Sequence, residues 1–391
     1  MLSAEFTYFW HIKENYLKMS KNKAIVGFMG AGGIARAHAF ALNSLRYYYN
    51  DSPETEIEAV CSATEQSRNT FASQFGFRNS VSFEEFVSNG NIDSVYILGP
   101  NKVHYEHLKA AATMPSIKRI YVEKPVCSTY EEEIHMANII KEHPEIKIQV
   151  GFQYLFMPSV REALIFWKSG KLGKAIHFDL KYYHGDYLRK EYRNKRSTRL
   201  TPAPDGGAMA DLGSHAISLA IAFLGDRLNI TGAIQSGNYK DVTQDSDLFS
   251  LITMFDDKTG AAGTLSASRI SSGTGDTLCM ELFAEKGTLR FTSQSPEFFE
   301  YYSEETGSWN RIITGSNYRP VSSFPSGHVP PGWLRSMIHA HYVFLTGNDP
   351  EAVIPDLTHG LSVQRLVRET AKHLKTFRDL TWVKKKSLSD G

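Results

Sequence analysis

The feature that most constrains this chain is a glycine-rich turn, Gly-Ala-Gly-Gly-Ile-Ala, at residues 30–35. The apolar run at 23–29 predicts a buried parallel strand before the turn, and the Ala- and Leu-rich stretch at 34–48 predicts a helix after it. A strand, a G-x-G-x-x-A turn and a helix in this order form the fingerprint of dinucleotide-binding domains, in which the glycines let the backbone approach a pyrophosphate. The turn therefore predicts a Rossmann-type domain that binds a nicotinamide dinucleotide through Gly30, Gly32, Gly33 and Ile34.

Strand and helix patterns alternate after the turn as far as residue 151 and change beyond it. The expected strands are 56–62, 92–98, 119–123 and 147–151, and the expected helices between them are 66–75, 104–114 and 130–142. This alternation predicts βαβ units and a doubly wound parallel sheet. From 228 to 313 the chain has successive β-rich runs separated by turn residues, which predicts an antiparallel meander. Further helices are expected at 160–169, 211–224, 334–346 and 357–376, with a loop at 314–332.

These patterns divide the chain into two folded parts. We expect an N-terminal arm at 1–22, a dinucleotide-binding Rossmann domain at 23–150, an α+β domain for substrate binding and oligomerisation at 151–376 and a tail at 377–391. The fold class is thus α/β plus α+β, with a doubly wound parallel sheet followed by an open, mostly antiparallel sheet. A length of 391 residues suits two domains, because single cores rarely grow beyond about 250–300 residues.

The composition argues against several classes of function. A net charge of +1 gives no basic field for nucleic acid, and no apolar stretch approaches the ~18 residues that a membrane span needs. Residues 1–22 lack the apolar core of a signal peptide. The three cysteines are widely spaced and the fourteen histidines show no metal-ligand spacing, so neither disulfides nor a metal site are expected. We therefore expect a cytoplasmic protein without a bound metal ion.

The end of the second expected strand bears on the choice of cofactor. The fingerprint usually has an acidic residue there, which holds the ribose 2′-hydroxyl. This chain has Ser62 and Thr64 instead, followed by Arg68. The two hydroxyl side chains suit either a 2′-hydroxyl or a 2′-phosphate, and Arg68 either pairs with a phosphate or is a solvated helix residue. NAD is the first expectation, and NADP stays open.

Polar residues follow the third and fourth strands, at the edge of the sheet where open α/β folds bind their ligands. Pro100, Asn101 and His104 follow the third strand, and Glu123 and Lys124 follow the fourth. We expect all five to lie at the cofactor site.

Three polar residues supply the groups that alcohol oxidation requires. A histidine accepts the hydroxyl proton near neutral pH, a carboxylate orients the imidazole, and a lysine stabilises the developing alkoxide. Lys124 is the lysine, and Asp211 and His215 are spaced i, i+4, so they would share one face of a helix. Taken singly, these are more often a solvated lysine, a helix cap and a packed histidine, but their combination favours a catalytic group.

The order of G-x-G-G-I-A, P-N-x-x-H, E-K-P and G-G-x-x-x-D-x-G-x-H along residues 23–375 resembles the Gfo/Idh/MocA family. This is the family of glucose-fructose oxidoreductase, inositol dehydrogenase and rhizopine-catabolism proteins. The resemblance implies that Lys124, Asp211 and His215 form the catalytic group and that Asn101 and His104 lie by the nicotinamide. It also implies a second domain whose open sheet builds a homodimer or homotetramer.

Two departures from the family pattern bear on the substrate. Many members carry basic residues after the last Rossmann strand, whereas this chain has Gln153 and Tyr154 there. That favours a neutral sugar, with Tyr154 as a contact surface. Trp333 is a second candidate sugar platform, with core packing as the alternative.

The second departure is a long insert between residues 182 and 205. It places His184, Asp186 and Tyr187 shortly before the catalytic Asp-His pair, and similar segments in sugar-oxidising members lie over the substrate. Its basic run at 189–196 suits either a solvated loop or an active-site lid. A structural loop remains the alternative for the whole insert.

These observations predict an NAD(P)-dependent oxidoreductase that acts on a secondary hydroxyl of a neutral sugar, polyol or glycoside, with a 3-keto sugar as one product. Two rivals remain open. One is a glycosidase-type enzyme in which bound NAD oxidises the sugar transiently to allow elimination. The other is a dinucleotide-binding regulator without turnover. Release of free NADH with a sugar substrate distinguishes the dehydrogenase from both rivals.

Overall fold

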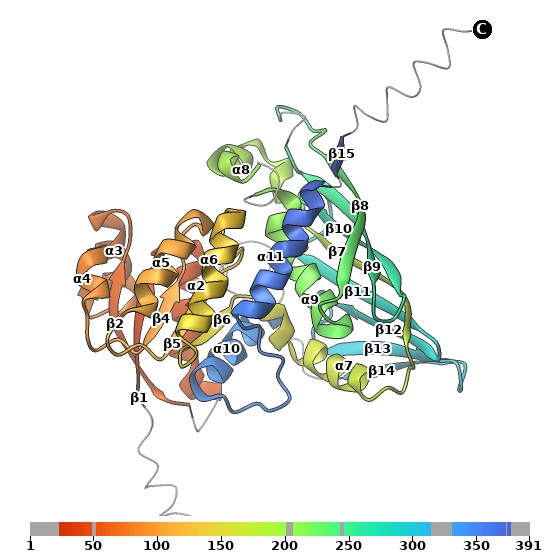
Figure 1. Cartoon of the computed structure of the whole chain (residues 1–391), viewed down its shortest axis with the longest axis horizontal. Helices are drawn as coiled ribbons and strands as arrows, with labels where there is room; N and C mark the ends of the chain where they lie inside the picture. Colours follow the sequence, from red (N-terminus) through yellow and green to blue (C-terminus); the bar gives the residue numbers. More distant parts are fainter. Residues whose placement is uncertain are drawn as a thin grey trace, which may run out of the picture.

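The structure is a computed structural model that describes residues 23–48, 52–200, 206–242, 246–313, 331–372 and 374–376. The expected N-terminal arm, nearly all of the loop at 314–332 and the tail at 377–391 lie outside the described residues. Two sheets with their covering helices account for the described chain (Figure 1).

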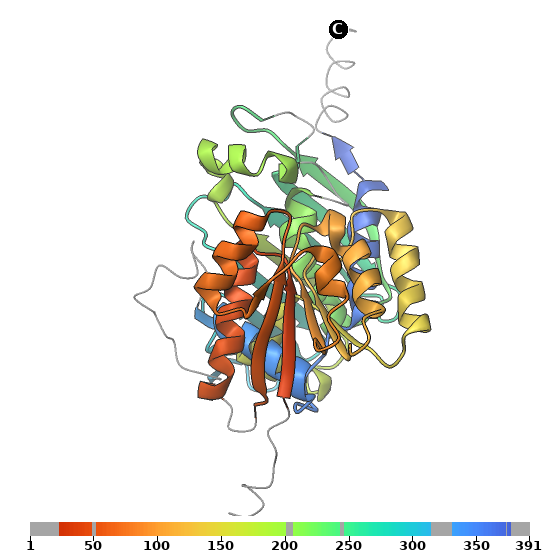
Figure 2. The ribbon, with the colours of Figure 1, turned by 90° about the vertical axis from the view of Figure 1, so that its left-hand side faces the viewer.

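The first sheet has six parallel strands in the order β3-β2-β1-β4-β5-β6, which confirms the doubly wound prediction. Helices lie on both of its sides (Figure 2). Because both faces are covered, a central strand such as β4 is buried along its whole length. The elements are β1 (Lys23–Met29), α2 (Gly33–Tyr48), β2 (Glu54–Cys61), α3 (Glu65–Phe75), β3 (Asn79–Ser80), α4 (Phe83–Val87), β4 (Ser94–Ile97), α5 (His104–Ala112), β5 (Arg119–Val122), α6 (Tyr130–Glu142) and β6 (Lys147–Val150).

The second sheet has nine strands in the order β14-β13-β12-β11-β7-β10-β9-β8-β15. The expected meander is therefore wrong in one respect, because β7 lies between β10 and β11 and runs parallel to β10. No strand was predicted at β7, and its last residues were expected to belong to the insert. The strands are β7 (Ala175–Tyr183), β8 (Leu228–Ser236), β9 (Phe249–Asp256), β10 (Ala262–Ser268), β11 (Thr277–Ala284), β12 (Gly287–Thr292), β13 (Phe298–Ser303), β14 (Ser308–Ile313) and β15 (Leu374–Thr376).

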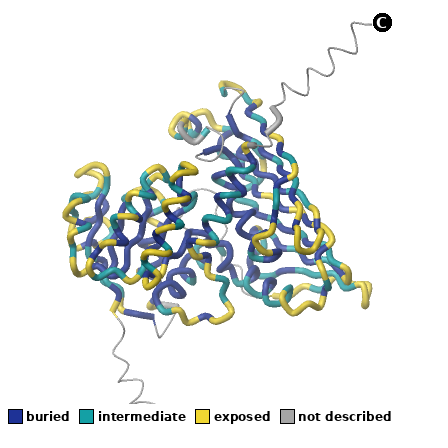
Figure 3. Tube along the Cα trace, in the orientation of Figure 1, coloured by how far each residue is buried: buried dark blue, intermediate teal, exposed yellow. Residues whose placement is uncertain are grey.

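Helices cover one face of the second sheet, and the other face is open. The covering helices are α7 (Pro158–Lys168), α9 (Ser214–Leu224) and α11 (Leu357–Lys372), on the side that faces the first sheet (Figures 1 and 3). Exposed apolar side chains such as Ile176, Phe255 and Ile313 belong to the sheet's own strands. Oligomerisation through this sheet stays a prediction. Within the described residues, no helix is both long enough and apolar enough to span a membrane.

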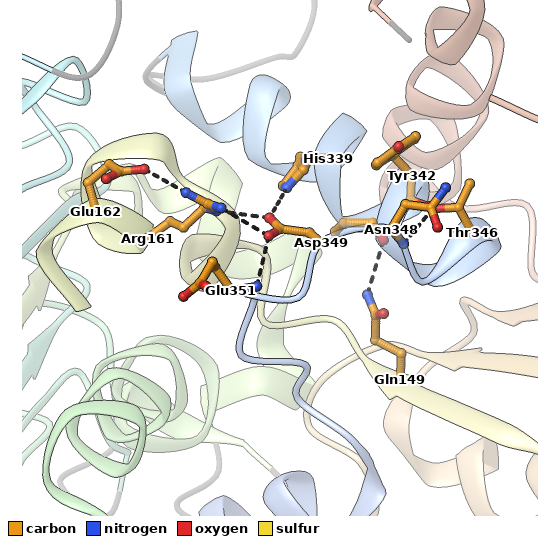
Figure 4. Close-up of polar contacts among 10 residues, drawn as sticks. Gln149, Arg161, Glu162, His339, Tyr342, Thr346, Asn348, Asp349 and Glu351 are labelled. Atoms are coloured by element: carbon orange, nitrogen blue, oxygen red, sulfur yellow. Dashed lines mark hydrogen bonds and ion pairs between the residues drawn. The ribbon is translucent and has the colours of Figure 1, made fainter. Parts of the chain in front are cut away.

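One late helix connects the two halves of the molecule. α10 (Pro331–Thr346) packs against α2 of the first sheet and against the turn that follows β6. The loop after α10 carries Asp349, which is buried and accepts hydrogen bonds from Arg161 Nε at 2.8 Å, Arg161 Nη2 at 3.0 Å and His339 Nε2 at 3.0 Å (Figure 4). The Arg161–Asp349 pair therefore fixes α10 to α7.

We predict that Arg161→Met destabilises the fold in a pH-dependent way. The hydrogen bonds from Arg161 hold the pKa of Asp349 well below its usual range. A depressed carboxyl pKa adds stability above the unfolded value of about 4, and this stability is lost as the pH falls towards the folded value. The variant should lose about 2 kcal/mol of unfolding free energy at pH 7 and less at pH 4, as measured by urea denaturation.

Lys190→Met is the matched control, because the Lys190–Asp241 ion pair is exposed and should contribute less than about 1 kcal/mol. Equal losses for the two variants, or a loss for Arg161→Met that does not change with pH, would contradict the assignment.

Candidate active site

The glycine turn has the geometry of a dinucleotide site. Gly30 has a φ of 134°, and its N–H donates to the carbonyl oxygen of Cys61 at 2.9 Å. A Cβ added at Gly30 would lie 2.7 Å from the carbonyl carbon of Leu98, so only glycine fits there. Gly32 and Gly33 are exposed, and a Cβ on either would meet no atom within 4 Å. The backbone at the start of α2 is thus open to a pyrophosphate, and Ile34 packs behind it.

A cavity of about 510 Å³ lies beside this turn, against α3. Its lining includes Arg36, Thr64 and Ser67 and, among the described residues, no Asp or Glu side chain. Thr64 accepts a hydrogen bond from the Ser67 amide at 3.2 Å and so caps α3, and Ser62 Oγ lies 2.5 Å from Ser67 Oγ. Arg68 does not line this cavity, whereas Arg36, for which no role was predicted, does. The roles of Ser62, Thr64 and Arg68 in choosing the cofactor stay predictions.

The loops after β4 and β5 are tied together by a buried histidine. Asn101 begins a short 3₁₀ turn after Pro100. His104 follows, with Nδ1 at 2.8 Å from the carbonyl oxygen of Pro125 and Nε2 at 2.9 Å from that of Gly99. Both ring nitrogens of His104 therefore contact backbone within the protein. The contact of His104 with the cofactor stays a prediction, and the position of His104 favours a role in holding the two loops in place.

Glu123 is held by a chain of buried side chains. Its Oε1 lies 2.9 Å from His38 Nε2, His38 Nδ1 lies 2.9 Å from His341 Nε2, and His341 Nδ1 lies 2.9 Å from the Tyr96 hydroxyl. A carboxylate only accepts, so His38 donates to Glu123 through Nε2. If each ring carries one proton, His341 donates to His38 and the Tyr96 hydroxyl donates to His341. The other carboxylate oxygen of Glu123 accepts from the Lys124 amide at 3.2 Å. The chain thus links α10 to the backbone of the predicted catalytic lysine.

Lys124 and Asp211 meet between the two sheets. Lys124 Nζ donates to the Asp211 carbonyl oxygen at 2.8 Å and to Oδ1 of its carboxylate at 3.0 Å. Oδ2 of Asp211 accepts from Nη2 of Arg269 at 2.9 Å, and the side chain of Arg269 is fully buried. The Arg269 guanidinium lies 4.5 Å from the centre of the Tyr187 ring. One carboxylate is therefore fixed between two cations that come from different sheets.

This arrangement corrects the expected role of Asp211. The sequence predicted that Asp211 orients His215, because residues four apart share one face of an α-helix. Asp211 instead lies in a π-helical turn, Met209–Gly213, ahead of α9. The wider π turn displaces it from the face that His215 occupies. Nδ1 of His215 has no hydrogen-bond partner among the described residues, so Asp211 does not hold that nitrogen.

His215 is positioned by aromatic packing. Its ring centre lies 5.8 Å from that of Phe152, 5.1 Å from that of Tyr154 and 5.7 Å from that of Tyr182. Burial and the nearby Lys124 cation hold the pKa of His215 well below its usual value, and the Asp211 charge opposes this only in part. The imidazole is therefore neutral at pH 7 and able to accept a proton.

Some of the residues predicted to contact substrate lie at the His215 site, and others are buried away from it. Tyr154 lines the His215 site, and His184 is buried near it, with Nδ1 accepting from the Asp186 amide at 3.1 Å. The Asp186 carboxylate accepts from Arg189 at 2.7 Å. Tyr187 is buried under Arg269, so its predicted place on the substrate surface is not supported.

Trp333 is also displaced from its predicted role. Its side chain is 9% exposed, belongs to the hydrophobic core and directs its indole N–H at the side-chain amide of Gln153. Core packing, the alternative considered for Trp333, is what the structure supports. The basic run at 189–196 contains α8 (Lys190–Lys195), whose buried Arg193 donates to the carbonyl oxygens of Tyr187 and Leu188.

Sequence analysis missed residues that contribute to this site from distant segments. They are Arg36, His38, Tyr96, Tyr182, Arg269, Asp276 and His341. Only the tertiary fold brings most of them to the site. His38 offered a local signal, because a histidine in an otherwise apolar helix face needs a buried partner. Among the described residues, no group of three or more potential ligands could hold a metal ion.

We predict that Tyr96→Phe and Tyr121→Phe differ in stability although the two side chains are equivalent in position. They pair across β4 and β5 and both are fully buried. The Tyr96 hydroxyl ends the chain to Glu123, whereas the Tyr121 hydroxyl has no hydrogen-bond partner among the described residues. Tyr96→Phe should cost about 1 kcal/mol in urea denaturation, and Tyr121→Phe should be neutral or stabilising. Equal effects would mean that the hydrogen bonds from Tyr96 through to Glu123 contribute no stability.

Several dehydrogenases are similar to this chain in sequence, and solved structures share its fold. Levoglucosan dehydrogenase of Pseudarthrobacter phenanthrenivorans is 25% identical over 292 residues, covering 68% of this chain and 73% of that protein. Glucose-6-phosphate 3-dehydrogenase of Bacillus subtilis is 26% identical over 200 residues, covering 50% of this chain and 52% of that protein. The solved complex of levoglucosan dehydrogenase with NADH and levoglucosan has a TM-score of 0.75 at 20% identity and covers 90% of this chain and 97% of that one, which shows a shared fold.

Two family descriptions match consecutive parts of the chain. Residues 24–152 match "Oxidoreductase family, NAD-binding Rossmann fold", and residues 160–290 match "GFO/IDH/MocA C-terminal domain". Together these matches span well over half of the chain and include the glycine turn, Lys124, Asp211 and His215. The chain therefore belongs to the Gfo/Idh/MocA family of oxidoreductases, which has an NAD-binding Rossmann domain.

Proposed function

We propose that this chain is an NAD(P)-dependent dehydrogenase that oxidises a secondary hydroxyl of a neutral sugar, polyol or glycoside. The observation that carries the proposal is the placement of the Lys124 ammonium close to the neutral, buried imidazole of His215, at the edge of the Rossmann sheet where its ligands bind. Several relatives are named as sugar dehydrogenases, including those for levoglucosan and D-xylose. The open glycine turn and the adjoining cavity fit a dinucleotide.

The proposed chemistry separates a proton from a hydride. A nicotinamide, when bound, supplies the hydride acceptor. His215 accepts the hydroxyl proton, because burial and the Lys124 cation keep its imidazole neutral. Lys124 donates a hydrogen bond to the same oxygen and stabilises the charge that develops there. The carbon loses hydride as the C=O bond forms, so the products are a keto sugar, a reduced cofactor and one proton.

Asp211 and Arg269 support this step without contacting the reacting atoms. The Asp211 carboxylate accepts from Lys124 Nζ and so fixes where the ammonium points. Arg269 holds the second carboxylate oxygen in turn. Fixed donors need no reorganisation during the reaction, which is the main source of electrostatic catalysis. Asp211 is thus proposed to orient the lysine rather than the histidine.

We predict that Lys124→Met and His215→Asn each lower kcat by about 10² to 10⁴ while the cofactor still binds. The assay is a panel of levoglucosan, D-glucose and D-xylose, with NAD and NADP in parallel, followed at the nicotinamide absorbance. Cofactor affinity is measured separately by calorimetry. Lys118→Met is the matched control, because Lys118 is an exposed lysine whose ammonium pairs with Asp93 outside the site.

Near-normal turnover in either site variant would overturn the assignment of these residues. A wild-type protein that binds the cofactor and sugar but releases no reduced nicotinamide would overturn the dehydrogenase proposal.

A further inference from the structure

A second half-buried carboxylate, Asp276, lies beside the His215 site in the loop between β10 and β11. Its backbone is left-handed, with a φ of 46°, which is uncommon for a residue other than glycine. The loop is fixed by hydrogen bonds to the turn after β12. Ser293 Oγ donates to the Asp276 carbonyl oxygen at 2.8 Å, and Gln294 Nε2 donates to that of Gly275 at 2.6 Å. The fold therefore holds this carboxylate in one place.

Two tyrosine hydroxyls connect Asp276 to the wall of the His215 site. The Tyr182 hydroxyl donates to Asp276 Oδ1 at 3.2 Å, and the Tyr154 hydroxyl lies 2.9 Å from that of Tyr182. Since Tyr182 donates to the carboxylate, Tyr154 donates to Tyr182. The rings of both tyrosines pack against His215. The three side chains thus form one polar strip next to the proposed proton acceptor.

Asp276 differs from Asp211 in having no paired cation. Among the described residues, no Lys, Arg or His nitrogen forms an ion pair with Asp276, whereas both Lys124 and Arg269 pair with Asp211. His184 is near, but burial lowers its pKa and leaves the ring neutral at pH 7. A carboxylate that is partly withdrawn from water is costly unless donors satisfy its oxygens. Among the described residues, Tyr182 supplies one donor to Asp276 for about four acceptor positions, so its carboxylate can accept further hydrogen bonds.

We propose that Asp276 is a specificity-determining residue that accepts hydrogen bonds from a pair of neighbouring hydroxyls on an uncharged sugar and excludes phosphorylated sugars. The inference rests on the proposed function and names the substrate class of the same site. Sugar hydroxyls supply the missing donors, and hydrogen bonds to a charged acceptor are among the strongest available. A phosphate at the same position would bring two anions together in a poorly solvated site and would be rejected.

The test compares wild type with Asp276→Asn. Asparagine has the same shape and tolerates the left-handed backbone, so the loop should keep its conformation. Asp241→Asn is the matched control, because Asp241 also has a left-handed φ, of 59°, but its side chain is exposed and pairs with Lys190 rather than with Tyr182. Tyr182→Phe is a second variant that removes the donor to Asp276 without changing its charge. Levoglucosan, D-glucose, D-xylose and D-glucose 6-phosphate are the probes, in turnover assays and in calorimetry on the NADH-loaded protein.

We expect Asp276→Asn to raise KM and Kd for the neutral sugars about tenfold to hundredfold, with a much smaller change in kcat. The preference for D-glucose over D-glucose 6-phosphate should fall in this variant and stay unchanged in Asp241→Asn. Tyr182→Phe should weaken sugar binding less than Asp276→Asn does.

Neutral-sugar KM and Kd within twofold of wild type in Asp276→Asn would overturn the inference, as would a wild type that prefers the phosphorylated sugar. A wild type that binds these sugars but oxidises none would instead overturn the proposed function, and the calorimetric comparison would still decide the role of Asp276.

Discussion

The Asp211 carboxylate, fixed between Lys124 and Arg269, is the interaction on which the geometry of the site depends. Lys124 follows β5 of the first sheet, and Arg269 follows β10 of the second. Asp211 stands between them in the turn that opens α9. A fully buried arginine side chain is costly without a counter-charge, and a lysine at the end of a strand would otherwise sample many positions. The shared carboxylate supplies a counter-charge to the arginine and restricts the lysine.

A second buried network supports the same site from behind. Hydrogen-bond contacts run from Tyr96 on β4 to His341 on α10, and from there through His38 on α2 to Glu123 after β5. The Arg161–Asp349 pair fixes the loop that follows α10 to α7. Polar groups in a core are unfavourable unless each has a partner, but a fully paired network admits few alternative packings. The two networks together make the position of the Lys124 backbone depend on a helix that begins more than two hundred residues later.

Local patterns predicted most of the fold. The turn at 30–35, the apolar runs of the parallel strands and the order of the sequence motifs depend on neighbouring residues, so they can be read along the chain. The nine-stranded sheet was predicted less well, because β7 pairs with strands whose residues lie 85 to 109 positions further along the chain. No local pattern records such a pairing.

The site shows the same division. Lys124, Asp211 and His215 were found from their motifs, and the structure brings them into one site. The partners that position them were not found, since Arg269 lies 58 residues from Asp211 and His341 lies 303 residues from His38. The orienting role predicted for Asp211 assumed an α-helical face, whereas the chain makes a π turn there and Nδ1 of His215 has no partner among the described residues. Trp333 was predicted to contact substrate from its aromatic side chain, with core packing as the alternative, and Tyr187 from its place in the insert. Both are buried in the structure, and local sequence does not record the burial of a single aromatic residue.

The central claim is that this site moves a hydride from a sugar carbon to the nicotinamide, and isotope transfer tests it most directly. Levoglucosan and D-glucose with deuterium at every carbon-bound hydrogen would be incubated with the protein and with NAD or NADP. The cofactor would then be analysed by mass spectrometry. The account predicts reduced cofactor that carries one deuterium, formed more slowly than from the unlabelled sugar. Reduced cofactor without deuterium, or bound sugar and cofactor with no reduction, would contradict it.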